Sequence, residues 1–211
     1  MFQSSRLGVL CLLLVACVSS AVGVDVYDDP TLIIATASGP IQGYHSEYAN
    51  LTARAWLGIP YASPPNGTLR FKPPTPPESW SQLRDASVAG PGCQQSCSLP
   101  PGLCPPVLSE DCLYLNVFAP ESMDGTLLPV MIWIHGGNFR QGSGSTGMYD
   151  GTVFVNSTQV ILVTINYRLG ALGFFWNQDS PANNGLLDQQ MAMQWVQKNI
   201  FNFGSVHHEQ V

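Results

Sequence analysis

The feature that most constrains this chain is a continuous apolar run at 130–134 that ends abruptly in two adjacent glycines, Gly136 and Gly137. A short, uninterrupted run rich in β-branched residues predicts a strand that is buried on both faces. Adjacent glycines after such a strand allow a tight turn and leave backbone N–H groups free to face a ligand. Free N–H groups suit an oxyanion that develops during acyl transfer, while an ordinary glycine-rich turn would explain the same residues.

A second apolar run and a helix follow. The run at 160–167 predicts another buried strand, the segment 168–173 predicts a loop, and the pattern over 186–200 predicts an amphipathic helix. Asn183 or Asn184 is a suitable cap for this helix. Strands and helices in this order predict the α/β class.

The part of the chain before these runs predicts short strands and irregular segments. Prolines at 60, 64 and 65 predict a loop of fixed conformation over 58–71 rather than a central strand. The segment 142–151 is rich in glycine and has no helical period, and 121–128 predicts a turn. We expect the N-terminal strands to be antiparallel and to lead into a mostly parallel sheet; these strands are expected at 32–36, 41–44, 53–57 and 113–118.

The first 23 residues have the pattern of a secretory signal peptide. Arg6 precedes a short apolar block at 7–18, and small residues permit cleavage after Ala21 or Gly23. A membrane anchor would need about 20 apolar residues, so we expect no membrane span after cleavage. The sequence therefore predicts a secreted protein, or one of the secretory-pathway lumen.

Composition narrows the function classes further. The formal net charge is −6 and no basic run occurs, which argues against a nucleic-acid partner. Four cysteines remain after the predicted signal peptide. In an exported chain they suggest two disulfides, and no C-x-x-C pair supports a zinc site; they are Cys93, Cys97, Cys104 and Cys112. Neither a metal nor an organic cofactor is implied. Three N-x-S/T triplets predict a glycoprotein, at Asn50, Asn66 and Asn156.

Four segments together resemble the type-B carboxylesterase and cholinesterase family. The segment 109–117, Ser-Glu-Asp-Cys-Leu-Tyr-Leu-Asn-Val, matches a family signature nearly residue for residue. The other similar segments are 58–71, 130–139, and 166–174 together with 184–195. The resemblance covers about 32–204 and implies the N-terminal part of an α/β-hydrolase domain, which we place at 24–204.

The resemblance also implies roles for residues of the glycine loop. The oxyanion-hole N–H groups would belong to Gly137 and Asn138, with Gly136 as a loop glycine. The family usually has a third glycine where this chain has Asn138. A backbone donor survives that change because Asn tolerates positive φ better than most residues.

Structural residues can be assigned from the same resemblance. It implies two buried ion pairs, Arg70 with Glu110 and Arg168 with Asp188. It also implies a disulfide between Cys93 and Cys112, which leaves Cys97 and Cys104 to pair with each other. The loop between Cys93 and Cys112 contains no tryptophan, whereas the cholinesterases carry one there for the choline cation. Choline esters are therefore disfavoured as substrates.

The nucleophile of the family lies in a G-x-S-x-G turn on the strand after the helix at 186–200, and these 211 residues contain no such sequence. The residues 205–211 do not resemble the family, and nothing positions His207 or His208 as a base. We therefore expect a truncated serine esterase that lacks the whole catalytic triad, is inactive and is largely insoluble. The family function would be hydrolysis of a small carboxylic ester. The alternative is a non-catalytic, cholinesterase-like adhesion or binding protein, and the retained Gly136 and Gly137 favour the enzyme.

Overall fold

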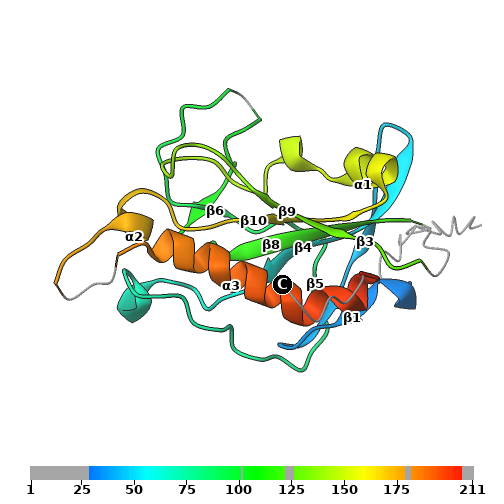
Figure 1. Ribbon diagram of the computed structural model, residues 1–211, viewed down its shortest axis with the longest axis horizontal. Coiled ribbons are helices and arrows are strands. Elements are labelled where there is room, and N and C mark those ends of the chain that lie inside the picture. The colour runs from blue at the N-terminus through cyan, green and yellow to red at the C-terminus, as the bar shows by residue number, and fades with distance from the viewer. Residues whose placement is uncertain (1–28, 101, 122–125, 179–181, 206–211) are drawn as a thin grey trace, which may run out of the picture.

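The computed structural model describes residues 29–100, 102–121, 126–178 and 182–205. The predicted signal peptide at 1–23, most of the segment 205–211 and part of the turn predicted at 121–128 lie outside the described residues. A five-stranded mixed sheet forms the centre of the fold, with helices on both of its faces (Figure 1). Its strands, in spatial order, are β3 (Tyr44–Tyr48), β4 (Leu51–Pro60), β8 (Tyr114–Pro120), β10 (Ile161–Ile165) and β9 (Val130–Ile134).

The first four strands of the central sheet pair antiparallel, and β10 pairs parallel with β9. The antiparallel N-terminal part expected from the sequence is therefore present, and the parallel part is the β9–β10 pair. Two smaller sheets flank the central one. They contain β1 (Ile33–Ala35), β2 (Pro40–Gln42) and β5 (Arg84–Asp85) in one, and β6 (Gly92–Cys93) and β7 (Leu108–Ser109) in the other.

Helices cover the two faces of the sheet with separate apolar clusters. The long helix α3 (Asn184–Asn199) continues into a 3₁₀ turn, η4 (Ile200–Phe203), and packs Trp195 and Phe203 into the larger cluster. Trp56 meets Phe203 edge to face, with ring centroids 4.9 Å apart. On the opposite face α1 (Thr152–Thr158) packs Val155 against Phe118. The remaining short elements are η1 (Pro30–Leu32), η2 (Gly67–Leu69), η3 (Gly147–Tyr149) and α2 (Gly170–Phe174).

Strand β9 differs from the sequence prediction, which placed it buried on both faces. Met131 is 49% exposed and Trp133 44% exposed, and an apolar groove of about 340 Å³ lies beside them. The cause is position, because β9 is the edge of the sheet and pairs only with β10 among the described residues. Just before β9, Leu128 forms a parallel bridge with Ser205, and its N–H donates to the carbonyl of Gly204.

Three further predictions about local structure are wrong. Pro60 was expected in a loop, yet it is the last residue of β4 and pairs with Tyr114. Proline is tolerated at a strand end, where the missing N–H breaks little of the ladder. The segment between the two apolar runs was expected to show no helical period, yet it contains α1 at 152–158, and the loop expected at 168–176 contains α2. Helix α1 is rich in β-branched residues and α2 contains two glycines, so both have weak intrinsic helix propensity. Tertiary packing outweighs that weak propensity.

Candidate active site

The loop 135–144, which follows β9 and is called the glycine loop below, has an unusual backbone. Gly137 has φ of 121°, and the two residues after it, Asn138 and Phe139, both have φ of 58°. The carbonyl oxygen of Gly137 accepts hydrogen bonds from the N–H groups of Arg140 (3.1 Å) and Gln141 (3.2 Å). These bonds close a tight turn. A side chain at position 137 would collide with the carbonyl of Gln141, so this turn requires glycine there.

The backbone N–H groups of Gly137 and Asn138 donate no hydrogen bond to any of the residues that the structure describes. Asn138 is exposed and Gly137 half-buried. Both N–H groups are therefore accessible to a ligand, and two consecutive unpaired donors after a strand constitute a candidate binding site for a negatively charged or polar oxygen.

His135 and Tyr167 stabilise the start of the loop by packing against each other. Their rings stack with centroids 4.5 Å apart, and the Tyr167 hydroxyl donates to the carbonyl oxygen of His135 over 3.1 Å. Burial lowers the pKa of His135, so the ring is neutral at pH 7. Its Nδ1 lies 2.9 Å from the carbonyl oxygen of Gly136, and since a carbonyl only accepts, Nδ1 carries the proton. This histidine therefore shapes the loop and is not arranged as a general base.

The predicted ion pair of Arg168 and Asp188 is present and buried. The guanidinium donates from Nε to Oδ2 (2.8 Å) and from Nη2 to Oδ1 (2.7 Å), and the backbone N–H of Arg168 donates to Oδ2 (3.0 Å). Their side chains are 3% and 0% exposed. Burial raises the pKa of Asp188, and the hydrogen bonds and charge of Arg168 oppose that shift. Two residues later, Gly170 donates to the carbonyl oxygen of Phe139 over 2.8 Å, so the pair anchors a segment that holds the glycine loop.

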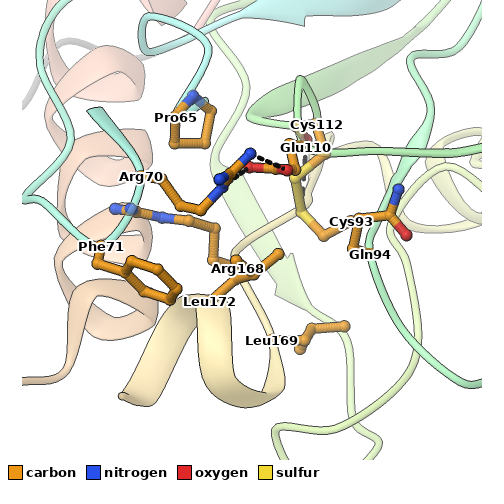
Figure 2. A pocket seen from close by; sticks show the side chains of 10 residues that line it. All are labelled: Pro65, Arg70, Phe71, Cys93, Gln94, Glu110, Cys112, Arg168, Leu169 and Leu172. Atoms are coloured by element: carbon orange, nitrogen blue, oxygen red, sulfur yellow. Dashed lines mark hydrogen bonds and ion pairs between the residues drawn. A yellow bond between two sulfur atoms is a disulfide. The ribbon is translucent and has the colours of Figure 1, made fainter. Parts of the chain in front are cut away.

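Arg70 and Glu110 also form the predicted pair, through two hydrogen bonds of 2.6 Å (Figure 2). The expectation that this pair is buried is wrong, because the side chain of Arg70 is 43% exposed and that of Glu110 is 26% exposed. Both residues lie on surface loops, next to a small cavity beside the Cys93–Cys112 disulfide. The hydrogen bond from Arg70 lowers the pKa of Glu110. An exposed pair of this kind contributes little to stability.

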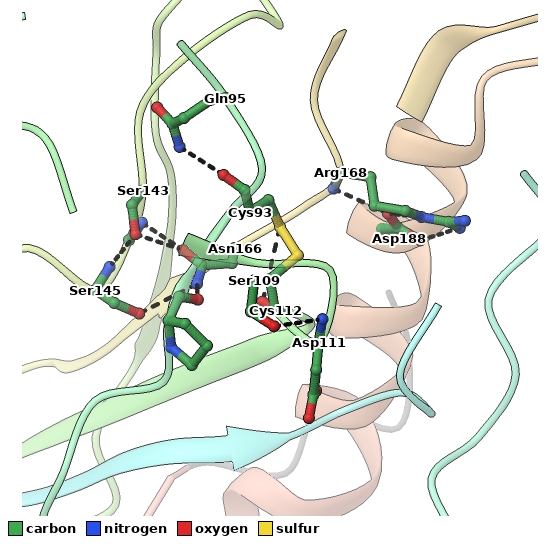
Figure 3. The surroundings of a disulfide bond; sticks show 12 residues. Cys93, Gln95, Ser109, Asp111, Cys112, Ser143, Ser145, Asn166, Arg168 and Asp188 are labelled. Atoms are coloured by element: carbon green, nitrogen blue, oxygen red, sulfur yellow. Dashed lines mark hydrogen bonds and ion pairs between the residues drawn. A yellow bond between two sulfur atoms is a disulfide. The ribbon is translucent and has the colours of Figure 1, made fainter. Parts of the chain in front are cut away.

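Both expected disulfides are formed, Cys93 with Cys112 and Cys97 with Cys104. The first is buried, and the second closes a small ring within the loop of the first. Figure 3 shows the buried disulfide beside residues that contact the glycine loop, which are Gln95, Ser143, Ser145 and Asn166. The loop between Cys93 and Cys112, the disulfide loop, and the glycine loop are therefore neighbours, although Gln95 and Gly142, which join them, are 47 residues apart in the sequence.

Sequence reasoning missed two residues that hold the glycine loop. Asn166 accepts from Ser143 Oγ (2.9 Å) and from the Gly144 N–H (2.8 Å), and its own amide donates to Ser145 Oγ (3.2 Å). Gln95 contacts both backbone groups of Gly142. Asn166 lies in a segment already noted for its family resemblance, whereas nothing local in the sequence distinguishes Gln95.

The serines near the loop are not arranged as nucleophiles. Ser143 is buried and donates to Asn166, so its hydroxyl is paired with an amide and not with a histidine. Activation of a serine requires an adjacent base. In the part of the chain that the structure describes, no group of three or more metal-binding side chains is present, and no helix is long and apolar enough to span a membrane.

The three N-x-S/T asparagines occupy different environments. Asn50 lies in the exposed turn between β3 and β4, and Asn66 is exposed before η2. Asn156 is half-buried in α1, and its Nδ2 donates to the carbonyl oxygens of Thr52 (2.9 Å) and Thr152 (2.8 Å).

Comparisons with known proteins agree on one family. The profile of the Carboxylesterase family matches residues 30–207. The chain is 43% identical to cocaine esterase of Oryctolagus cuniculus, over 84% of this chain and 35% of that protein. It is 45% identical to para-nitrobenzyl esterase of Bacillus subtilis strain 168, over 82% of this chain and 35% of that protein. A solved structure, a thermophilic PNB esterase, matches with a TM-score of 0.76 at 45% identity, over 83% of this chain and 36% of the other. The chain spans about a third of the length of these relatives.

Proposed function

Since this chain belongs to the carboxylesterase family and has part of an α/β-hydrolase fold, we propose that its loop 135–144 is the oxyanion-hole portion of a carboxylic ester hydrolase. The observation that carries the proposal is the pair of unpaired backbone N–H groups at Gly137 and Asn138, directly after strand β9. The substrate class is a small carboxylic ester. No metal or organic cofactor is required for this chemistry.

In such a reaction the ester carbonyl oxygen gains negative charge when a nucleophile attacks its carbon. The N–H groups of Gly137 and Asn138 donate to that oxygen and stabilise the charge more in the transition state than in the ground state. Loss of one such donor typically costs about 10²–10³ in kcat. Asn138 adopts a left-handed conformation with φ of 58°, which supports its use as a backbone donor where relatives usually have glycine.

The remaining catalytic groups are proposed to come from outside these residues. The 211 residues contain no G-x-S-x-G sequence. His135 is hydrogen-bonded to the Gly136 carbonyl oxygen and Ser143 donates to Asn166, so neither is arranged as a catalytic group. Acyl transfer needs an activated nucleophile, so we expect no ester hydrolysis by the 211-residue chain on its own. We also propose cleavage of a signal peptide at 1–23, secretion and N-glycosylation. The two disulfides support passage through an oxidising compartment.

A chimaera tests the proposed function. Residues 29–204 of this chain replace the homologous N-terminal part of Bacillus subtilis para-nitrobenzyl esterase, which supplies the other catalytic groups. A folded chimaera is expected to hydrolyse a p-nitrophenyl ester, and the Asn138→Gly variant is expected to be at least as active. The control is the chimaera with its nucleophilic serine replaced by alanine. A chimaera that folds, retains its disulfides and shows no more activity than this control would favour the non-catalytic adhesion or binding alternative.

A further inference from the structure

We propose that Gln95 is a positioning residue that fixes the proposed oxyanion loop to the disulfide loop. The expected effect on catalysis rests on the proposed function. The expected effect on the loop rests only on the hydrogen bonds of Gln95. The side-chain amide of Gln95 forms hydrogen bonds with both backbone groups of a single residue, Gly142. Its Oε1 accepts from the Gly142 N–H over 2.7 Å, and its Nε2 donates to the Gly142 carbonyl oxygen over 2.8 Å.

The fixed residue lies immediately after the turn that carries the two free donors. Gly137 accepts from the N–H of Gln141, and Gln141 is bonded covalently to Gly142. The two ends of the loop also touch. A Cβ at Gly142 would lie 2.5 Å from the carbonyl oxygen of Gly136 and 2.5 Å from His135 Nδ1. Displacement of Gly142 therefore moves the peptide unit between Gly136 and Gly137, and with it the first proposed donor.

A second contact joins the same two loops. The Oε1 of Gln141 accepts from the Ser98 N–H over 2.8 Å and from the Ser98 hydroxyl over 3.2 Å. Ser98 follows Cys97, and Gln95 lies between Cys93 and Cys97, so both glutamine contacts connect the loop 135–144 to a segment that the disulfides constrain. Gln95 Nε2 additionally donates to the Cys93 carbonyl oxygen over 3.0 Å, which orients the side chain from the disulfide side.

Only a primary amide of this length makes both bonds to Gly142 at neutral pH. Glutamate keeps the acceptor for the Gly142 N–H but loses the donor, and its charge then faces the Gly142 carbonyl oxygen. Below the carboxyl pKa, ordinarily about 4.3, a protonated glutamic acid regains one donor and one acceptor. The Gln95→Glu variant should therefore be defective at neutral pH and recover in acid, which a loss of packing would not reproduce.

The test uses the chimaera, or the 211-residue chain where it is soluble, with the disulfides formed, and measures amide hydrogen exchange by NMR at Arg140, Gln141 and Gly142. Gln95→Ala is expected to speed exchange at these amides about tenfold relative to wild type, and to leave β10 unchanged. Gln95→Glu is expected to show the same acceleration of exchange at pH 7 and to return to within about fourfold of wild type at pH 4, where a carboxyl of pKa about 4.3 is about two-thirds protonated. The matched controls are Gln94→Ala and Gln94→Glu, because Gln94 is the exposed neighbour.

The proposal would be overturned if amide exchange at residues 140–142 were as slow in Gln95→Ala as in wild type. It would also be overturned if Gln94→Ala accelerated that exchange as much as Gln95→Ala does. If Gln95→Ala does not fold, the acid recovery of Gln95→Glu decides, and its absence also overturns the proposal. In the chimaera, Gln95→Ala is expected to lower kcat about tenfold with KM within about twofold. An inactive parent chimaera together with faster loop exchange would reject the proposed function and leave the positioning role intact. An active chimaera that Gln95→Ala does not affect would reject the positioning role.

Discussion

The buried pair of Arg168 and Asp188 gives the sharpest stability prediction. Replacement of Asp188 by asparagine leaves the shape nearly unchanged but removes the partner of a guanidinium that is 3% exposed. Apart from its contacts with residue 188, the guanidinium donates from Nη1 to the carbonyl oxygen of Lys72 (2.8 Å), and asparagine offers it an amide oxygen but no negative charge. Leaving a buried charge without its counterion costs about 3–5 kcal/mol. Because a domain is stable by only about 5–15 kcal/mol, this single substitution should remove a large part of the free energy of unfolding.

The double variant Arg168→Met with Asp188→Leu separates the charge effect from the packing effect. It leaves no unpaired charge, and its main remaining cost is the backbone N–H of Arg168, which loses its acceptor on Asp188. An unsatisfied buried donor costs about 1–3 kcal/mol. The double variant is therefore expected to be more stable than Asp188→Asn, although it changes two residues instead of one.

Urea unfolding followed by far-ultraviolet circular dichroism measures both free energies. Expressed as the chimaera, or as the 211-residue chain where it is soluble, wild type, single and double variants are compared at pH 7. A loss below about 1 kcal/mol for Asp188→Asn would show that the charge is not effectively buried. A double variant less stable than the single would show that packing, rather than the unpaired guanidinium, dominates at this site.

Further predictions concern the loop, one histidine and the glycans. In the chimaera, Gly137→Ala is expected to lower kcat by about 10²-fold or more. Gly136→Ala should have a smaller effect, because no atom lies within 4 Å of the added Cβ. Burial lowers the pKa of His45, but hydrogen bonds to two carboxylates outweigh it and leave the pKa above 6.5. The contribution of protonated His45 to stability is present below pH 6.5 and is lost as the pH rises through the folded pKa. The midpoint temperature of thermal unfolding should therefore fall over this pH range in wild type, and His45→Asn should remove that fall. Glycopeptide mass spectrometry should find glycan at Asn66 and none at Asn156, whose Nδ2 already donates twice; a glycosylated Asn156 contradicts this assignment.

The sequence predicted the α/β organisation because its apolar periodicity and its motifs are local. Both apolar runs and the helix α3 were located from their patterns alone. The short helices α1 and α2 were missed because seven and five residues are too few to show a helical period. Strand β9 was assigned to the right residues and the wrong environment. Composition records how apolar a strand is, whereas burial depends on which strands pair with it.

The candidate site was predictable only in part, for a similar reason. The adjacent glycines, with Asn138 after them, signalled a backbone of positive φ, and the structure shows φ of 121° at Gly137. The stack of His135 on Tyr167 and the contacts of Gln95 join segments about thirty to fifty residues apart. Contacts of this kind follow from the tertiary fold and leave no spacing pattern in the sequence.

The nested arrangement of the two disulfides has a consequence for biosynthesis. The four cysteines of the described residues permit three pairings, and the pairing in the structure places Gln95 and Ser98 against the glycine loop. A scrambled isomer can keep the β8–β10 strand pairing, since those strands contain no cysteine, and still present a misplaced loop. Correct pairing of these cysteines would then decide whether the glycine loop is placed as in the structure, even where the central strand pairing has already formed.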